Sequence, residues 1–221
     1  MENLNLELVK YIEENIFPEY AKNEKGHNLD HIHDVIERSF KIMKQNDLVL
    51  DNDMVYTIAA YHDIAHHIDS KNHEKLSADY LLADTNLKNF FSDDEIKIMA
   101  EAVADHRASM EGDPRSEYGK LVSSADRNNT VKQCLKRSYY YGKKIDPDAT
   151  DEQLFKRAYD VLKKKFGVGG YAKFYYKDED YDNFLKEIRE LLEDEDKFCN
   201  AQKEYIYELE GRKIKWKRKM L

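Results

Sequence analysis

The sequence predicts an all-α protein, a helical bundle with a C-terminal helical extension. Only three prolines and eight glycines interrupt the 221 residues, and apolar residues recur at helical spacing in nearly every segment between them. Hydrophobic residues make up 41% of the chain, which favours a folded core that needs no support from disulfides.

Helix boundaries in the first part follow from caps and breakers. Pro18 ends the first helix, and the side chains of Asn28–Asp30 and of Asp51 or Asn52 can cap the next two. Three acids follow Ser92 and suit the positive end of a helix. The expected helices span residues 4–17, 28–45, 52–68, 73–83, 92–109, 116–128 and 130–141.

The character of the sequence changes near Gly142, because all histidines lie at or before His106. Chemistry is therefore expected in residues 1–145, and residues 146–221 are expected to form a helical layer or lid packed on that core. Further helices are expected over residues 150–166, capped by Thr150, and over 179–219, with an interruption near Cys199.

Composition excludes several classes of protein. The net charge of −8 disfavours a nucleic-acid polymer as partner. Cys134 and Cys199 form no CxxC pair, which disfavours a thiolate zinc site. The first ten residues lack an apolar signal core, and the stretch 54–61 is too short to span a bilayer. We therefore expect a cytoplasmic protein with no membrane partner, and a homo-oligomer remains open.

Histidine and aspartate side chains recur on the inward faces of the expected helices. His62 and Asp63 follow Ile58 and Ala59 at a spacing of four, which places the pair on the apolar face.

His31, His106 and Asp126 each lie four residues from an apolar residue on other helices. A single inward histidine is more often a hydrogen-bonded core residue than a ligand, but three helices that each supply an inward His or Asp are difficult to explain by packing.

A metal ion accounts for this pattern. A buried carboxylate without a partner is costly, and a cation removes that cost. His31, His62, Asp63 and Asp126 would form a mixed nitrogen and oxygen site that suits Mn, Fe, Mg or Ni and does not exclude Zn. Four protein ligands in six-coordinate geometry leave two positions, one for water and one for a substrate oxygen.

Three segments carry these residues in a fixed order. Residues 26–35 are GHNLDHIHDV, residues 59–66 are AAYHDIAH, and residues 122–127 are VSSADR. This ordered set, over about residues 25–130, resembles the motifs of the HD-domain phosphohydrolase superfamily. The ligand in the first motif of that family is the second histidine, which assigns the role to His31 rather than His27.

The resemblance implies an HD-domain helical core over residues 1–145 with a divalent metal at its centre. It also implies hydrolysis of phosphate esters, often of nucleotides, by a metal-bound hydroxide. An arginine that members carry after the first-motif ligand would stand at His33 or Asp34 here, so one expected substrate contact is absent.

Further site residues flank the metal ligands. With Asp63, His66 is a catalytic candidate that binds the phosphate or protonates the leaving oxygen, and its alternative role is to hold a ligand in place. His73 and His106 are expected to bind substrate phosphate beside one metal, or to hold a second ion. Arg107 and Arg127 are expected to bind the substrate, with surface salt bridges as the alternative.

The resulting hypothesis is a metal-dependent phosphohydrolase that acts on a nucleotide or another small phosphate ester. One alternative is a non-catalytic module that senses a nucleotide. A second alternative is a di-iron oxygenase of the HD type.

Overall fold

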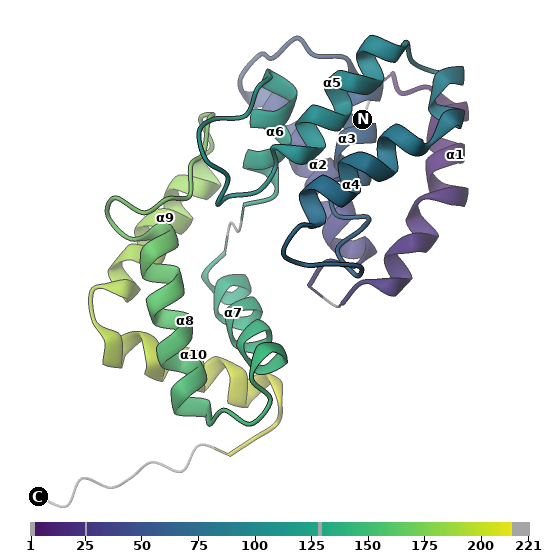
Figure 1. Cartoon of the computed structure of the whole chain (residues 1–221). Coiled ribbons are helices and arrows are strands. Elements are labelled where there is room, and N and C mark those ends of the chain that lie inside the picture. The colour runs from purple at the N-terminus through teal and green to yellow at the C-terminus, as the bar shows by residue number, and fades with distance from the viewer. Residues whose placement is uncertain (1–2, 25, 128–129, 214–221) are drawn as a thin grey trace, which may run out of the picture. The chain divides into compact units, whose positions relative to one another are not determined.

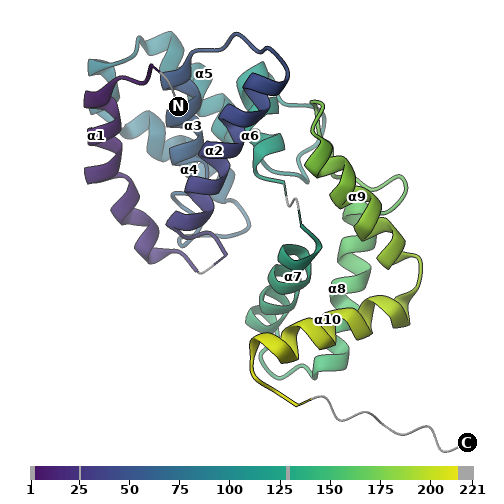
Figure 2. The same ribbon diagram turned by 180° about the vertical axis from the view of Figure 1, so that it is seen from behind.

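The structure is a computed structural model that describes residues 3–24, 26–127 and 130–213. These residues form helices and no strand, which confirms the predicted all-α class (Figures 1 and 2). The α-helices are α1 (Leu6–Asn15), α2 (Leu29–Gln45), α3 (Asn52–Tyr61), α4 (His73–Ala83), α5 (Asp93–Ala104), α6 (Glu117–Ala125), α7 (Val131–Ile145), α8 (Asp151–Phe166), α9 (Glu179–Leu192) and α10 (Glu195–Leu209), with 3-10 helices at Phe17–Lys22 and Thr85–Asn89.

The described residues divide into two compact units. The first unit runs to Arg127 and also includes Lys173–Asp178, a segment that follows α8 in the chain. The second unit holds α7 to α10. The division falls after Arg127, whereas the sequence analysis places it at residue 145.

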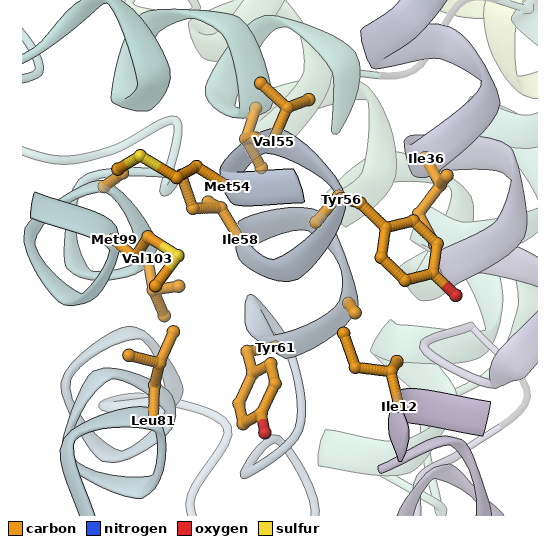
Figure 3. Close-up of a cluster of buried hydrophobic side chains, with 14 of the residues drawn as sticks. Ile12, Ile36, Met54, Val55, Tyr56, Ile58, Tyr61, Leu81, Met99 and Val103 are labelled. Carbon is orange, nitrogen blue, oxygen red and sulfur yellow. The ribbon is translucent and has the colours of Figure 1, made fainter. Parts of the chain in front are cut away.

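Helix α3 forms the middle of the first unit. Every residue from Met54 to Tyr61 is buried, which explains the apolar stretch that the sequence shows there. Side chains from α1, α2, α4 and α5, among them Ile12, Ile36 and Leu81, pack around it (Figure 3). None of the described helices has the length and apolar content needed to cross a bilayer.

Three helices of the first unit are shorter than predicted. α3 stops at Tyr61, α5 at Ala104 and α6 at Ala125. Residues 62–68 form turns with hydrogen bonds between residues three apart, such as the bond from the His66 amide to the Asp63 carbonyl. The chain beyond the ends of α3, α5 and α6 therefore carries His62, Asp63, His66, His106 and Asp126. His31 lies in the first turn of α2, and His73 begins α4.

The second unit packs α8 against α7, α9 and α10 around Tyr139, Leu154, Phe155 and Ile206. Thr150 caps α8 in a capping box, as predicted. The tail helix is interrupted before Glu195, not near Cys199, because Asp194 caps a new helix there. The part of this predicted helix after residue 213 lies outside the described residues.

Candidate metal centre

Three histidines of the first unit are oriented in the same way. Nδ1 of His62 lies 2.8 Å from the carbonyl of Ala59, and Nδ1 of His106 lies 2.6 Å from the carbonyl of Val103. Nδ1 of His73 lies 3.1 Å from the carbonyl of Ser70. A carbonyl only accepts, so each Nδ1 donates its proton and each Nε2 keeps a lone pair for another partner.

The side chain of Asn23 explains why the His62-Asp63 pair leaves helix α3. Its amide nitrogen donates to the Asp63 carbonyl at 2.9 Å, and its oxygen accepts from the His67 amide at 2.9 Å. In a continuing α-helix these two backbone groups would bond each other. The Asn23 side chain bonds both groups instead. Together with Ser77, which accepts from the amide of Ala65, it turns the chain at His62 and Asp63.

The structure brings all four expected metal ligands together. Candidate ligand atoms of His31, His62 and Asp126 all lie within 4.8 Å of one another. Oδ2 of Asp63 lies 3.6 Å from Nε2 of His31 and 3.4 Å from Nε2 of His62. Nε2 of His31 is also 3.1 Å from Oδ1 of Asp126. We call this group the first cluster.

The other oxygen of Asp63 faces a second cluster. Its Oδ1 lies 3.2 Å from Nε2 of His73 and 3.5 Å from Nε2 of His106. The two Nε2 atoms are themselves 3.2 Å apart. Since each ring donates through Nδ1, two lone pairs and a carboxylate oxygen meet at this point, and only a positive charge between them makes the arrangement favourable.

The donor atoms fit divalent cations. Nε2 of His31, Nε2 of His62 and Oδ1 of Asp63 are buried and have no hydrogen-bond partner among the described residues. Buried polar atoms without partners are rare and costly, and coordination of a cation would satisfy all three. The C-terminal ends of α3, α5 and α6 lead into these side chains, and their partial negative charge also favours a cation.

Charges within the clusters shift the acidity of the aspartates. Burial opposes ionisation of Asp63, but the charge of His62 and the neighbouring rings hold the pKa of its carboxyl well below its usual range. Burial also opposes ionisation of Asp126, whose pKa His31 and His62 hold low.

The balancing positive charge falls on His62. Burial lowers the pKa of its imidazole, yet the charge of Asp63 outweighs burial and raises that pKa to about 9. Without a cation, a proton on His62 compensates the aspartates.

His66 lies beside the clusters, between His27 and His73. Its ring stacks on His27 at a centroid distance of 3.7 Å and 17° between planes, and Nδ1 of His27 lies 3.2 Å from Glu24. Candidate ligand atoms of Glu24, His27 and His66 also lie within 4.8 Å of one another, but stacked rings direct their in-plane lone pairs along parallel planes, which is a poor geometry for binding one ion. Burial, then the charge of His27, lowers the pKa of His66 to about 3, which keeps this imidazole neutral.

The two expected arginines have different surroundings. Arg107 is 35% exposed and pairs with Glu74 at 3.3 Å. Arg127 is buried, and its guanidinium donates to Ser123 and to the carbonyls of His106 and Lys173. Those bonds favour a role in holding the backbone around the site over the expected contact with substrate.

Two residues that hold the backbone near the clusters, Asn23 and Arg38, carry no signal in the sequence pattern. Each acts through carbonyls that lie 40 or more residues away in the chain, and spacing along one helix gives no signal for such contacts. The thiols of Cys134 and Cys199 are both free.

The first unit is thus an all-α unit in which histidines and aspartates converge from five helices and the turns after them, in groups that could hold a metal ion. Residues 28–129, somewhat less than half of the chain, match the family model of the HD domain, in agreement with the resemblance seen in the sequence.

Among solved structures, a predicted HD superfamily hydrolase from an uncultured Thermotogales bacterium is 22% identical. The match covers 71% of this chain and 84% of that chain, with a TM-score of 0.46. The search of curated proteins found no match.

Proposed function

We propose that this protein is a metal-dependent phosphohydrolase that cleaves a phosphate ester of a nucleotide or another small molecule. The observation that carries the proposal is the position of the Asp63 carboxylate, which presents Oδ2 to the first cluster and Oδ1 to the second. One carboxylate shared by two sets of imidazoles suits two divalent cations a few ångströms apart, the arrangement that grips both the attacking and the leaving oxygens in phosphoryl transfer.

In this proposal His31, His62 and Asp126 hold one cation, His73 and His106 hold the other, and Asp63 bridges both. Bound divalent cations supply a nucleophile by lowering the pKa of water and offset the charge of the phosphate. The geometry thus favours His73 and His106 as ligands of a second ion over direct contact with substrate.

The remaining residues orient the substrate. His31 and Asp126 keep 12% and 19% of their side chains exposed, so the first cluster is reached from solvent. His66 is neutral, which suits a hydrogen bond to a phosphate or leaving oxygen better than proton donation from an imidazolium. The Arg107 guanidinium, two-thirds covered and beside His106 in the chain, is the proposed phosphate contact.

The test combines metal content with a hydrolysis screen. Wild-type protein loaded with Mn²⁺ is assayed for phosphate release from nucleotides and simple phosphate esters, beside Asp63→Asn and Asp63→Ala. Asp34→Ala, an exposed aspartate on α2, is the matched control. We expect two ions per wild-type chain, near-complete loss of bound metal and activity in both Asp63 variants, and wild-type behaviour of the control.

Other outcomes select the alternatives. If the wild-type protein binds metal and a nucleotide but releases phosphate from no ester, the result selects the sensing module. Two iron ions also fit the shared carboxylate, so oxygen consumption by the Fe²⁺-loaded protein, with no phosphate release, would select the oxygenase. Unchanged metal content in Asp63→Asn, with circular dichroism showing intact helices, would overturn the proposed centre.

A further inference from the structure

The guanidinium of Arg38 grips the chain on both sides of Asp126. Arg38 lies on α2 and is 9% exposed. Its Nη1 donates to the carbonyl of Ala125 at 3.3 Å and to the carbonyl of Arg127. These are the residues directly before and after Asp126, so one side chain holds the peptide group that precedes an expected metal ligand and the carbonyl of the residue that follows it.

The same guanidinium is held by a segment from far along the chain. Residues 173–178, which we call the strap, belong to the first unit although α8 and α9 on either side of them belong to the second. Nη2 of Arg38 lies 3.4 Å from Oδ2 of Asp178, which is only 4% exposed. The ring of Phe174 lies 5.5 Å from the guanidinium carbon. Charge pairing and ring contact thus hold Arg38 from the strap.

The strap is also bonded along its backbone to the elements that carry the first cluster. The amide of Tyr175 donates to Oγ of Ser124, at 3.2 Å, and the carbonyl of Lys173 accepts from Arg127 at 3.3 Å. The amide of Lys177 donates to Oδ1 of Asn46 at 3.0 Å, just after α2 ends. Two of these partners lie within two residues of Asp126, so the strap and the turn that carries Asp126 form one hydrogen-bonded layer.

Asp126 depends on this layer because of where it lies. It is the C-cap residue of α6, beyond the last helical residue, where carbonyls lack partners within the helix. Arg38 supplies a partner to the carbonyls of Ala125 and Arg127. Without it, the turn after α6 gains alternative conformations and the carboxylate of Asp126 loses its fixed direction.

We infer that Arg38 and Asp178 are positioning residues that fix Asp126 for cation binding, and that docking of the strap is coupled to occupancy of the first cluster. The inference rests on the proposed metal centre and adds the residues that regulate its affinity. Because coupling between two binding events is reciprocal, a docked strap tightens cation binding and a bound cation tightens the strap.

Variants of Arg38 and Asp178 test the first half of this inference. Outer partners of metal ligands typically alter metal affinity by about 10- to 100-fold. We therefore expect Asp178→Asn and Arg38→Gln to weaken Mn²⁺ binding by about that factor, measured by calorimetry. The Co²⁺ absorption spectrum of the loaded variants should change shape as the geometry at Asp126 relaxes. Arg38→Lys, which keeps the charge and donors, should recover part of the affinity.

Asp151→Asn is the matched control. Asp151 accepts from Tyr139, Tyr207 and Arg212 in the second unit, so its substitution removes a comparable carboxylate without touching the first unit. Thermal unfolding of all variants separates lost stability from lost affinity. Equal Mn²⁺ affinity and an unchanged Co²⁺ spectrum in Asp178→Asn and Arg38→Gln would overturn the inference while leaving the metal centre intact.

Hydrogen exchange on the wild-type chain tests the second half of the inference, that a bound cation stabilises the docked strap. Saturating Mn²⁺ should slow exchange of the Tyr175 and Lys177 amides several-fold relative to protein in EDTA, and Asp178→Asn should abolish that difference. Exchange rates at these amides that are the same with and without Mn²⁺ would overturn the coupling between the strap and the first cluster. A wild-type chain that binds no Mn²⁺ at all would instead overturn the proposed function, and with it the positioning role of Arg38 and Asp178.

Discussion

At the scale of single residues, the charge balance of the site depends on whether Nε2 of His62 carries a proton or binds a metal ion. The atom is fully buried and faces the Asp63 carboxylate at 3.4 Å. Two low-pKa aspartates require a positive charge nearby, which either a proton or a cation can supply. A proton and a metal ion therefore compete for the same lone pair.

This competition predicts a pH-dependent metal affinity. In the metal-free protein the pKa of His62 is raised to about 9, so the ring is protonated at pH 7 and must lose that proton to bind metal. Affinity should therefore rise with pH up to about 9 and level off above it. Calorimetric titration with Mn²⁺ at pH 7, in two buffers of different ionisation enthalpy, should show about one proton released from His62. Proton release of zero and equal affinities at pH 7 and 8 would contradict this account.

The residues of the site differ in how well their positions can be predicted from the sequence. His31, the 62–63 pair and Asp126 were predictable because apolar residues four positions away fix their inward direction. His66 was chosen because it follows His62 by four residues, yet the helix ends before it, and its ring stacks on His27. Arg38 was not predictable, because its partner Asp178 is 140 residues away.

At the scale of elements, helix ends place the chemistry. The sequence predicted the helices and their N-terminal caps, such as Ser92 and Thr150, because a cap is a local hydrogen bond. It overestimated the C-terminal ends of α3, α5 and α6, because tertiary contacts end these helices. The end of α3 is the clearest case, since no glycine or proline interrupts residues 62–68 and the distant side chain of Asn23 turns the chain.

Asn23→Ala tests this explanation of the turn after α3. The substitution frees the Asp63 carbonyl and the His67 amide to bond each other, so the helix should extend past Tyr61 and turn Asp63 and His66 away from the clusters. We expect weaker Mn²⁺ binding and a loss of about 1 kcal/mol of stability, because the substitution removes the hydrogen bonds of the Asn23 side chain. Chemical denaturation and calorimetry measure the two effects.

The control for Asn23 is Asn15→Ala on α1, whose side chain donates to the carbonyl of Tyr11 in the same helix. This variant should keep wild-type metal affinity. If Asn23→Ala binds Mn²⁺ as tightly as the wild type, the turn after α3 does not depend on the Asn23 amide.

At the scale of the whole molecule, the two units have separate cores and only one of them contains the clusters. The core of the first unit draws on α1 to α6, and that of the second on α7 to α10. Every member of both clusters belongs to the first unit. The free energy of cation binding should therefore stabilise one unit and leave the other unchanged.

This separation predicts an uneven response to metal. A ligand that binds only the folded state at a hundredfold excess over its Kd adds about 2.7 kcal/mol of stability, which slows exchange of amides that open only on unfolding. In EDTA and in Mn²⁺, core amides of α2, α3, α5 and α6 should differ in exchange rate by up to about a hundredfold, because the cation must leave before the first unit opens. Core amides of α8 and α10 should exchange at the same rate in both conditions, since no cluster residue lies in the second unit. Equal protection of both sets by Mn²⁺ would mean that the two units unfold as one, and the metal centre would then stabilise the entire chain.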